Sequence, residues 1–276
     1  MRRINPKKPF AAITDEVMDL LGTGRQTTPF TRRTTLLTAE NAYQVTSALR
    51  LRRIQRGETP IGRKIGFTNR TIWDEYDVHQ PIWGDIYDST VVWLTNAHQN
   101  FALHGLAEPR IEPEIIFKLK HKPQAGMDDA QLLACMEWIA HGFELVQSLF
   151  FDWSFAAADT IAGCGLHGAL LIGQPYTIPA EAHPAWLDAL SHFSIDLYCD
   201  DHCVDTGFAK NVLDGPLKAL RHLLLMLEHD PYNSDVQAGE IITTGTLTRA
   251  FPVQPGQMWR SELFGINLPS ARLHFI

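Results

Sequence analysis

The sequence predicts an α+β fold, with a helical N-terminal portion over residues 1–60 and a β-rich domain of mixed strands over residues 61–276. Three observations favour it. The 276 residues are 45% hydrophobic and 20% charged, enough apolar material for a sizeable core. Apolar residues keep a helical spacing that stops before Pro60. Beyond Pro60, short apolar runs alternate with Gly and Pro, a pattern typical of strands.

A helix is expected from Thr38 to about Gly57. Thr38 can cap it, because a threonine hydroxyl accepts a hydrogen bond from a backbone N–H of the first turn. Gly57 and Pro60 end it. Residues 1–35 show little periodicity. The apolar residues that carry the helical spacing are Val45, Ala48, Leu49 and Ile54.

Beyond Pro60, the sequence predicts strands interrupted by two helices. The strand candidates are apolar runs bounded by turn-forming residues. They are residues 61–67, 90–94, 111–119, 142–150, 169–172, 193–198, 241–247 and 271–275. One helix is expected over about residues 129–140, with Asp128 as its cap, and the other over residues 216–228, ending before Pro231.

Charge and composition exclude several classes of protein. The chain has 24 Lys and Arg against 31 Asp and Glu, a net charge of −7. A general nucleic-acid binder needs a basic face, so this balance argues against one. The longest apolar run, residues 223–227, is far shorter than the roughly 20 residues that span a bilayer. No apolar stretch follows the basic N-terminus, and four cysteines make no disulfide framework. We therefore expect a soluble, reduced, cytoplasmic protein.

Two patterns resemble binding motifs but favour other interpretations. Residues 163–168 match G-x-G-x-x-G, but the residues that follow predict a strand, whereas a dinucleotide site needs a helix there. Cys199, His202 and Cys203 offer three zinc-type ligands, but no second pair of ligands accompanies them. Asp200 and Asp201 are typical of a turn, so a hairpin is expected.

Two glutamates stand on one face of the strand expected over residues 111–119. Side chains alternate along a strand, so Glu112 and Glu114 point to the same side, opposite an apolar face. Pro113 lacks an N–H donor and predicts that the strand lies at an edge or a bulge. The paired carboxylates fit a cation site, but this segment alone fits a solvated outer face equally well.

Glu144 and Lys64 favour the cation site. Glu144 lies inside an apolar strand that follows a helix, and a strand, helix, strand connection can return the chain beside its start. Three carboxylates would then meet, a donor set that suits Mg²⁺ or Mn²⁺ and leaves an excess charge of −1. Lys64, between Gly62 and Gly66, can balance that charge. A solvated lysine at the end of a strand is the alternative.

These residues resemble the fumarylacetoacetate hydrolase superfamily, in particular its 2-keto-4-pentenoate hydratase and 4-oxalocrotonate decarboxylase branch. The similar segments are residues 62–68, Glu112 to Phe117, residues 142–146 and residues 238–248 with Pro255 and Gly256. The resemblance runs from about Leu36 to the C-terminus. It implies a β-rich fold with a helical N-terminal part and a homo-oligomer. It also implies one Mg²⁺ or Mn²⁺ held by Glu112, Glu114 and Glu144.

The resemblance further implies a hydratase from the catabolism of aromatic rings. Water would add to a 2-hydroxy-2,4-dienoate through its 2-oxo-enoate form and give a 4-hydroxy-2-oxo acid. Lys64 would be catalytic, and Gly66, Trp83 and Gly168 would bind the substrate. A complex with a partner enzyme of the same pathway is also compatible with the resemblance.

Two departures from the family's pattern concern the substrate pocket. Ile82 stands where many hydratases of this branch carry an acid, and Asp85 is a candidate replacement. His167 stands where a serine is usual, and we expect it to be catalytic, by binding the substrate carboxylate or moving a proton. The missing acid keeps two alternatives open: a decarboxylase of a 4-oxalocrotonate-like diacid and an acylpyruvate C–C hydrolase. A non-catalytic partner in a hetero-complex is a third alternative, against which the retained glutamates and Lys64 argue.

Overall fold

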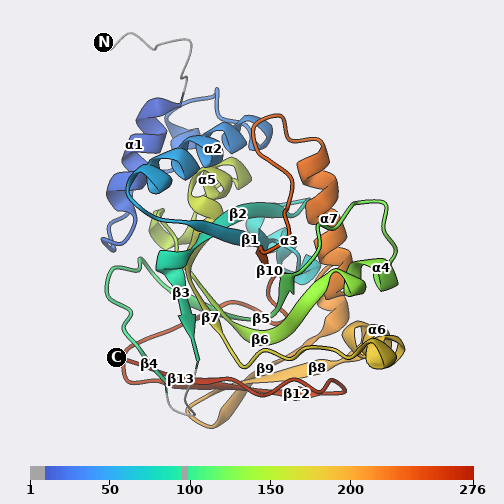
Figure 1. The fold of residues 1–276 in the computed structure, drawn as a ribbon. Helices are drawn as coiled ribbons and strands as arrows, with labels where there is room; N and C mark the ends of the chain where they lie inside the picture. Colours follow the sequence, from blue (N-terminus) through green and yellow to red (C-terminus); the bar gives the residue numbers. More distant parts are fainter. Residues whose placement is uncertain (1–9, 95–98) are drawn as a thin grey trace.

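The computed structural model describes residues 10–94 and 99–276. Within these residues, two β-sheets lie one above the other, with helices gathered at one end of the molecule and along one side (Figure 1). This arrangement of helices and mixed sheets confirms the expected α+β class.

The larger sheet is mixed and curls around an interior (Figure 1). The pairs β1–β10 and β3–β7 are parallel, and the other neighbours are antiparallel. A short strand, β11 (Phe251–Pro252), also pairs with β5. In spatial order the sheet consists of β2 (Ile82–Tyr87), β1 (Pro60–Gly66), β10 (Ile241–Thr243), β5 (Arg110–Leu119), β6 (Met136–Val146), β7 (His167–Ile172) and β3 (Val91–Trp93).

The smaller sheet packs against the outer face of β5 and β6. Phe143 and Leu145 of β6 share a buried cluster with Leu197 and Leu273 of the smaller sheet. Because side chains alternate, the face of β6 that carries Glu144 points into the curled interior instead. In spatial order the smaller sheet consists of β4 (Gln99–Phe101), β13 (Arg272–Phe275), β12 (Met258–Phe264), β8 (Ser194–Cys199) and β9 (His202–Phe208).

The N-terminal helices pack at the end of the curled sheet. The helix expected from Thr38 is confirmed as α2 (Ala39–Gln55), and the Thr38 hydroxyl accepts a hydrogen bond from the Asn41 N–H. Helix α1 (Ala11–Leu20), which the sequence did not predict, shares a buried cluster with α2 and with α5 (Ala157–Ala162). The expected division of the chain into two parts at residue 60 remains a prediction. Helix α2, from the first part, packs on α5, from the second part, in one buried cluster.

Three further helices lie along one side of the sheets (Figure 1). They are α4 (Asp129–Ala134), α6 (His183–His192) and α7 (Pro216–Glu228), and their apolar residues join those of β1, β5 and β6 in the largest buried cluster. The helix expected over residues 216–228 is confirmed as α7. A short helix, α3 (Trp73–Tyr76), follows β1.

Two expectations about β5 and β6 are wrong. The helix expected over residues 129–140 ends at Ala134, and β6 begins at Met136 because Trp138 and its neighbours pair with β5. β5 is an internal strand, not an edge, and the shift in its register with β6 lies at Lys118 and Leu119 rather than at Pro113. Pro113 is tolerated because β10 and β11 pair with other parts of β5 and leave a gap beside it. The Leu247 N–H donates to the Pro113 carbonyl across this gap.

The motif-like patterns adopt the structures expected of them. The residues after Gly168 form β7 rather than a helix. Cys199 and Cys203 lie in the hairpin of β8 and β9, with Asp200 and Asp201 at positive φ in its turn, and all four cysteines are free. In the part of the chain that the structure describes, no helix has the length and apolar character to cross a membrane. The expected lack of a signal segment falls partly on residues 1–9, outside the described residues.

Candidate active site

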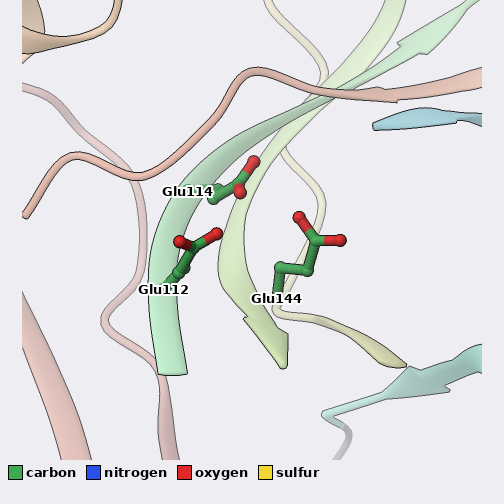
Figure 2. Close-up of side chains that lie close together, drawn as sticks. All are labelled: Glu112, Glu114 and Glu144. Atoms are coloured by element: carbon green, nitrogen blue, oxygen red, sulfur yellow. The ribbon is translucent and has the colours of Figure 1, made fainter. Parts of the chain in front are cut away.

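Three carboxylates meet on the inner face of β5 and β6. The two strands are antiparallel, and Glu112 lies directly opposite Glu144 in their register. Glu114, two residues along β5, shares the face of Glu112. One carboxylate oxygen from each residue lies within 4.8 Å of the other two (Figure 2). The strand pairing therefore brings together the three residues that the sequence suggested as metal ligands.

The two fully buried glutamates are each held by one oxygen. The Gly245 N–H donates to Glu114 Oε2 over 2.7 Å, and His167 Nδ1 donates to Glu144 Oε1 over 2.8 Å. Among the described residues, Glu114 Oε1 accepts no hydrogen bond, and Glu144 Oε2 has the ion pair with Lys64 but no hydrogen bond. Each side chain thus has one oxygen fixed by a hydrogen bond and one without such a bond, called its open oxygen below.

Lys64 lies on β1 with its ammonium beside these carboxylates. Its Nζ is 3.1 Å from Glu144 Oε2, and both side chains are almost fully buried. Burial lowers the pKa of Lys64, but the attraction of Glu144, Glu112 and Glu114 outweighs it and raises the pKa above its ordinary value. Lys64 is therefore a buried, charged ammonium.

The pKa values of the carboxyl groups are pushed apart. Burial raises the pKa of Glu112 to about 7, and burial together with its acidic neighbours raises the pKa of Glu114 well above its usual range. Burial acts in the same direction on Glu144, but Lys64 and His167 outweigh it and hold the pKa of Glu144 below its ordinary value. Glu144 is the glutamate whose ionised form the protein itself stabilises.

This donor set fits Mg²⁺ or Mn²⁺. Both ions prefer oxygen ligands, and buried carboxylate oxygens without a hydrogen bond are costly unless a cation satisfies them. Three ionised glutamates and one ammonium carry an excess charge of −2, which one divalent cation would neutralise. The open oxygens of Glu114 and Glu144, with Glu112 beside them, are the residues that would hold it.

A cavity opens onto this cluster. It is lined by Lys64, Gly66 and Glu112, and by mostly apolar side chains that include Ile82 and Leu166. Its remaining lining residues are Ile65, Phe67, Thr68, Asn69, Ile72, Arg110, Val146, Trp153, Gly165, Thr246, Arg249 and Ala250. The cavity therefore has one charged end, formed by the Glu112 carboxylate and the Lys64 ammonium, and apolar walls that suit a short hydrocarbon chain.

His167 and Gly168 line a different cavity. His167 is buried behind Glu144, where its Nε2 lies 2.8 Å from the Thr90 hydroxyl. Both residues border a cavity formed with Arg53, Arg56 and other residues near α2, and neither lines the cavity of Lys64. The structure thus places His167 against a proposed metal ligand and not where the sequence led us to expect a contact with the substrate.

Trp83 also lies elsewhere than expected. Its side chain is fully buried and stacks on Tyr43, and it does not line the cavity of Lys64. The alternation along β2 explains this, because Ile82 points into the cavity and Trp83 to the opposite face. Of the three residues expected to bind substrate, Gly66 lines this cavity, whereas Trp83 and Gly168 do not.

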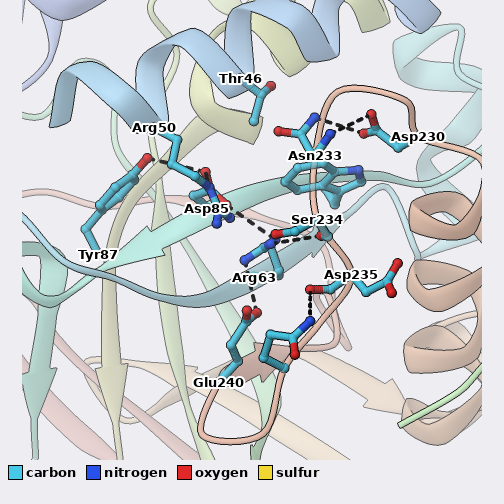
Figure 3. Close-up of polar contacts among 12 residues, drawn as sticks. Thr46, Arg50, Arg63, Asp85, Tyr87, Asp230, Asn233, Ser234, Asp235 and Glu240 are labelled. Atoms are coloured by element: carbon cyan, nitrogen blue, oxygen red, sulfur yellow. Dashed lines mark hydrogen bonds and ion pairs between the residues drawn. The ribbon is translucent and has the colours of Figure 1, made fainter. Parts of the chain in front are cut away.

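Asp85 does not replace the missing acid. It lies opposite Arg63 on β2, on the face of the sheet that points away from Lys64. There, Arg50 of α2 donates to Asp85 over 2.9 Å, and Arg63 Nε lies 3.4 Å from the same carboxylate. Arg63 also pairs with Glu240 at 3.0 Å, so a buried network joins α2, β1, β2 and the segment before β10 (Figure 3).

Sequence reasoning missed several residues of the cavity. Thr68 is buried, its hydroxyl makes no hydrogen bond with the described residues, and it lines the cavity. Arg110 and Arg249 line it as well, and the Arg110 guanidinium lies over the Trp153 ring. Thr68 closes the segment 62–68 and Gly245 lies within the segment 238–248. Both segments carry the resemblance to the family, so the sequence contained a signal for these regions. The structure was needed to show which residues of each segment reach the site.

Comparison with known proteins shows hydratases and a decarboxylase that are similar to most of this chain. No family model matches it. It is 30% identical over 250 residues to 2-hydroxyhexa-2,4-dienoate hydratase of Comamonas testosteroni, covering 90% of this chain and 91% of that enzyme. It is 25% identical over 227 residues to 4-oxalocrotonate decarboxylase of a Pseudomonas species, covering 82% of this chain and 84% of that enzyme. The fold resembles 4-oxalocrotonate decarboxylase of Pseudomonas putida G7, solved with magnesium and adipate, with a TM-score of 0.87 and 22% identity over the whole of both chains.

Proposed function

Because the chain belongs to the 2-keto-4-pentenoate hydratase and 4-oxalocrotonate decarboxylase branch of the fumarylacetoacetate hydrolase superfamily, we propose that it is a divalent-metal-dependent hydratase. It adds water to a short 2-hydroxy-2,4-dienoate and gives a 4-hydroxy-2-oxo acid. The observation that carries the proposal is the buried cluster of Glu112, Glu114 and Glu144, with open oxygens beside the Lys64 ammonium.

The three glutamates would hold one Mg²⁺ or Mn²⁺. A bound divalent cation supplies Lewis-acid stabilisation for negative charge that develops on the oxygens of a 2-oxo or 2-hydroxy acid. Glu114 and Glu144 are prepared for this role, since Gly245 and His167 fix the direction of their carboxylates. Pre-fixed ligands lower the ordering cost of binding.

Lys64 would handle the proton. The reaction moves a proton from the 2-hydroxyl group to C5 of the dienoate, and water then adds at C4 of the resulting 2-oxo-3-enoate. Lys64 Nζ borders the cavity and is the ammonium closest to the carboxylates, so it can hold a proton beside the substrate's oxygens and pass it along the chain. It also offsets negative charge in a buried site.

The cavity wall would position the rest of the substrate. Ile72, Ile82 and Leu166 suit the hydrocarbon part of a dienoate. Gly66 allows close approach beside Lys64, and the unpaired Thr68 hydroxyl offers a polar contact within the cavity. These contacts fix orientation, and the carboxylate cluster supplies the chemistry.

A decarboxylase of a 4-oxalocrotonate-like diacid is the second candidate. Two observations favour it: Ile82 leaves the cavity without the acid found in many hydratases, and Arg110 and Arg249 supply cationic groups for a second carboxylate. The chain's relatives include an enzyme of this name at 25% identity. The greater identity to a hydratase places this candidate second.

The deciding experiment uses metal-stripped protein with 2-hydroxypenta-2,4-dienoate and with a 4-oxalocrotonate-type diacid, each with and without Mg²⁺. Gain of one water by the dienoate, dependent on Mg²⁺ and identified by mass, is the expected result. Lys64→Met should abolish turnover while Mn²⁺ binding persists. Loss of carbon dioxide from the diacid without hydration of the dienoate would transfer the assignment to the decarboxylase.

We also propose that the protein works in the cytoplasm as a homo-oligomer, with a pathway enzyme as a further partner. The free cysteines fit a reducing compartment. Large apolar side chains on the described surface, including Leu36, Leu51 and Phe151, are each more than half exposed and fit a subunit contact. Sedimentation analysis of the purified chain tests the oligomer, and a monomer at micromolar concentration would exclude it.

A further inference from the structure

We propose that His167 is a positioning residue that fixes Glu144 as a one-oxygen ligand of the divalent cation, and that Thr90 in turn fixes His167. The proposal rests on the metal-dependent function proposed above. It assigns to His167 a role in metal affinity, in place of the contact with substrate that its sequence position suggested.

A β-bulge directs His167 toward Glu144. The pairing of β6 with β7 shifts between Leu145, which faces Ala169, and Val146, which faces His167, so Gly168 is the extra residue. Without the bulge, alternation would place His167 on the face of Leu145, away from Glu144. A Cβ on Gly168 would lie 2.7 Å from the Leu145 carbonyl oxygen, so the glycine accommodates the bulge.

The imidazole ring is held at both nitrogens. A carboxylate can only accept, so Nδ1 donates to Glu144 Oε1 over 2.8 Å. Nε2 meets the Thr90 hydroxyl over 2.8 Å, and that hydroxyl also lies 3.0 Å from the Tyr87 carbonyl oxygen. The side chains of His167 and Glu144 are at most 1% exposed, so water does not compete for these contacts.

This contact decides which oxygen of Glu144 remains open. With Oε1 bound by His167, Oε2 is the oxygen that faces Lys64. In the same way, the Gly245 N–H donates to Glu114 Oε2, and Glu114 Oε1 is the oxygen that has no hydrogen bond. Donors behind metal ligands typically contribute 10- to 100-fold to metal affinity, because they hold the ligand in its binding orientation.

Two substitutions at His167 separate positioning from simple filling of space. His167→Asn places an amide N–H near the position of Nδ1 and can still donate to Glu144. His167→Gln places its amide near Nε2 and can reach Thr90 only. Titration of metal-stripped protein with Mn²⁺, followed by electron paramagnetic resonance, should show about 10- to 100-fold weaker binding for His167→Gln. Binding by His167→Asn should stay close to that of the unchanged protein.

His141→Asn is the matched control. His141 is also buried on the larger sheet, on the opposite face of β6 from Glu144. Its Nδ1 donates to the Glu114 backbone carbonyl and its Nε2 meets the Ser261 hydroxyl, so neither nitrogen contacts a carboxylate oxygen. The asparagine amide can keep the contact with the Glu114 backbone, and Mn²⁺ affinity should not change. Thr90→Val is a second, milder variant that frees the ring without removing it, and it should weaken Mn²⁺ binding less than His167→Gln.

Equal Mn²⁺ affinity of His167→Gln and the unchanged protein would overturn the proposal. Equal weakening in His167→Asn and His167→Gln would also overturn it, since the donor to Glu144 would then be irrelevant. Failure of the proposed function looks different. In that case the unchanged protein binds Mn²⁺ with the His167 dependence described, yet converts neither the dienoate nor the diacid.

Discussion

Gly245→Ala tests how closely the backbone beside Glu114 is constrained. Gly245 has a φ of +92°, and its N–H donates to Glu114 Oε2. An added Cβ would lie 1.8 Å from the Thr68 hydroxyl oxygen and 2.9 Å from its Cβ, so one of the two segments must move. We expect the substitution to displace both the donor that holds Glu114 and the hydroxyl that lines the cavity.

The expected loss of stability has two parts. A left-handed backbone costs alanine about 1–2 kcal/mol, and forcing a methyl group into occupied space costs about 1–3 kcal/mol. Gly239→Ala isolates the first part, because Gly239 has a φ of +88° and nothing lies within 4 Å of an added Cβ. The free energy of unfolding of Gly245→Ala should therefore fall below that of Gly239→Ala by about 1–3 kcal/mol.

Urea denaturation and Mn²⁺ titration of both glycine variants check this prediction. Gly245→Ala should lose stability and Mn²⁺ affinity, whereas Gly239→Ala should lose only the backbone part of its stability. Thr68→Ala in the Gly245→Ala background removes the closest overlap and should recover part of the stability. If the two glycine variants have equal stability and equal Mn²⁺ affinity, the reasoning about this contact is refuted.

Three further predictions concern charge. Glu114→Gln should abolish Mn²⁺ binding without unfolding the chain, because an amide keeps the shape and loses the anionic oxygen; unchanged Mn²⁺ affinity would remove Glu114 from the metal site. The metal-free protein should lose stability as pH rises from about 4.5, the ordinary pKa of a glutamate, through about 7, the folded pKa of Glu112, and regain it with Mg²⁺. The raised pKa values of Glu112 and Glu114 mean that the folded state holds protons more tightly, so this stability is lost as pH rises through the folded pKa, about 7 for Glu112. Melting curves with a chelator test this, and a flat profile contradicts it. Asp85→Asn should cost up to about 3 kcal/mol in urea denaturation, because the partly exposed Arg50 loses its partner and the buried Arg63 keeps only Glu240; a loss below about 1 kcal/mol would show that the network is well solvated.

The parts of the fold that the sequence predicts are those with strong local signals. The cap at Thr38, the apolar face of α7 and the alternation along β5 all have local physical causes. The missed and misassigned segments lack such signals. Residues 136–140 are apolar without a clear period, and only pairing with β5 makes them a strand. Pro113 suggested an edge because no local pattern shows that β10 and β11 leave a gap beside it.

In the candidate site, too, the residues with local sequence signals were predicted correctly and those without such signals were not. The glutamates on β5 are placed by alternation. Glu144 is indicated by its place inside an apolar strand and Lys64 by its place between two glycines, and the resemblance to the family agrees with both. The position of His167 depends on a bulge that sequence spacing does not show, and that of Trp83 on which face of β2 the pairing with β1 turns toward Lys64. A one-residue bulge at Gly168 turns His167 to the other face of β7, and the alternation of β2 sends Ile82, not Trp83, into the cavity. One residue of shift therefore moves a side chain from one cavity to another.

The two faces of β1 show how the fold sustains a cluster of like charges. Lys64 points inward to the three glutamates, and its neighbour Arg63 points outward to Asp85 and Glu240. Buried carboxylates repel one another before a cation arrives, so their strands need support that does not depend on the metal. The Arg63 network ties β1 to α2 and to the segment before β10. Gly245, which holds Glu114, follows β10 after Thr244. The charged network on the outer face thus stabilises the strands from which both the inner ammonium and the donor to Glu114 project.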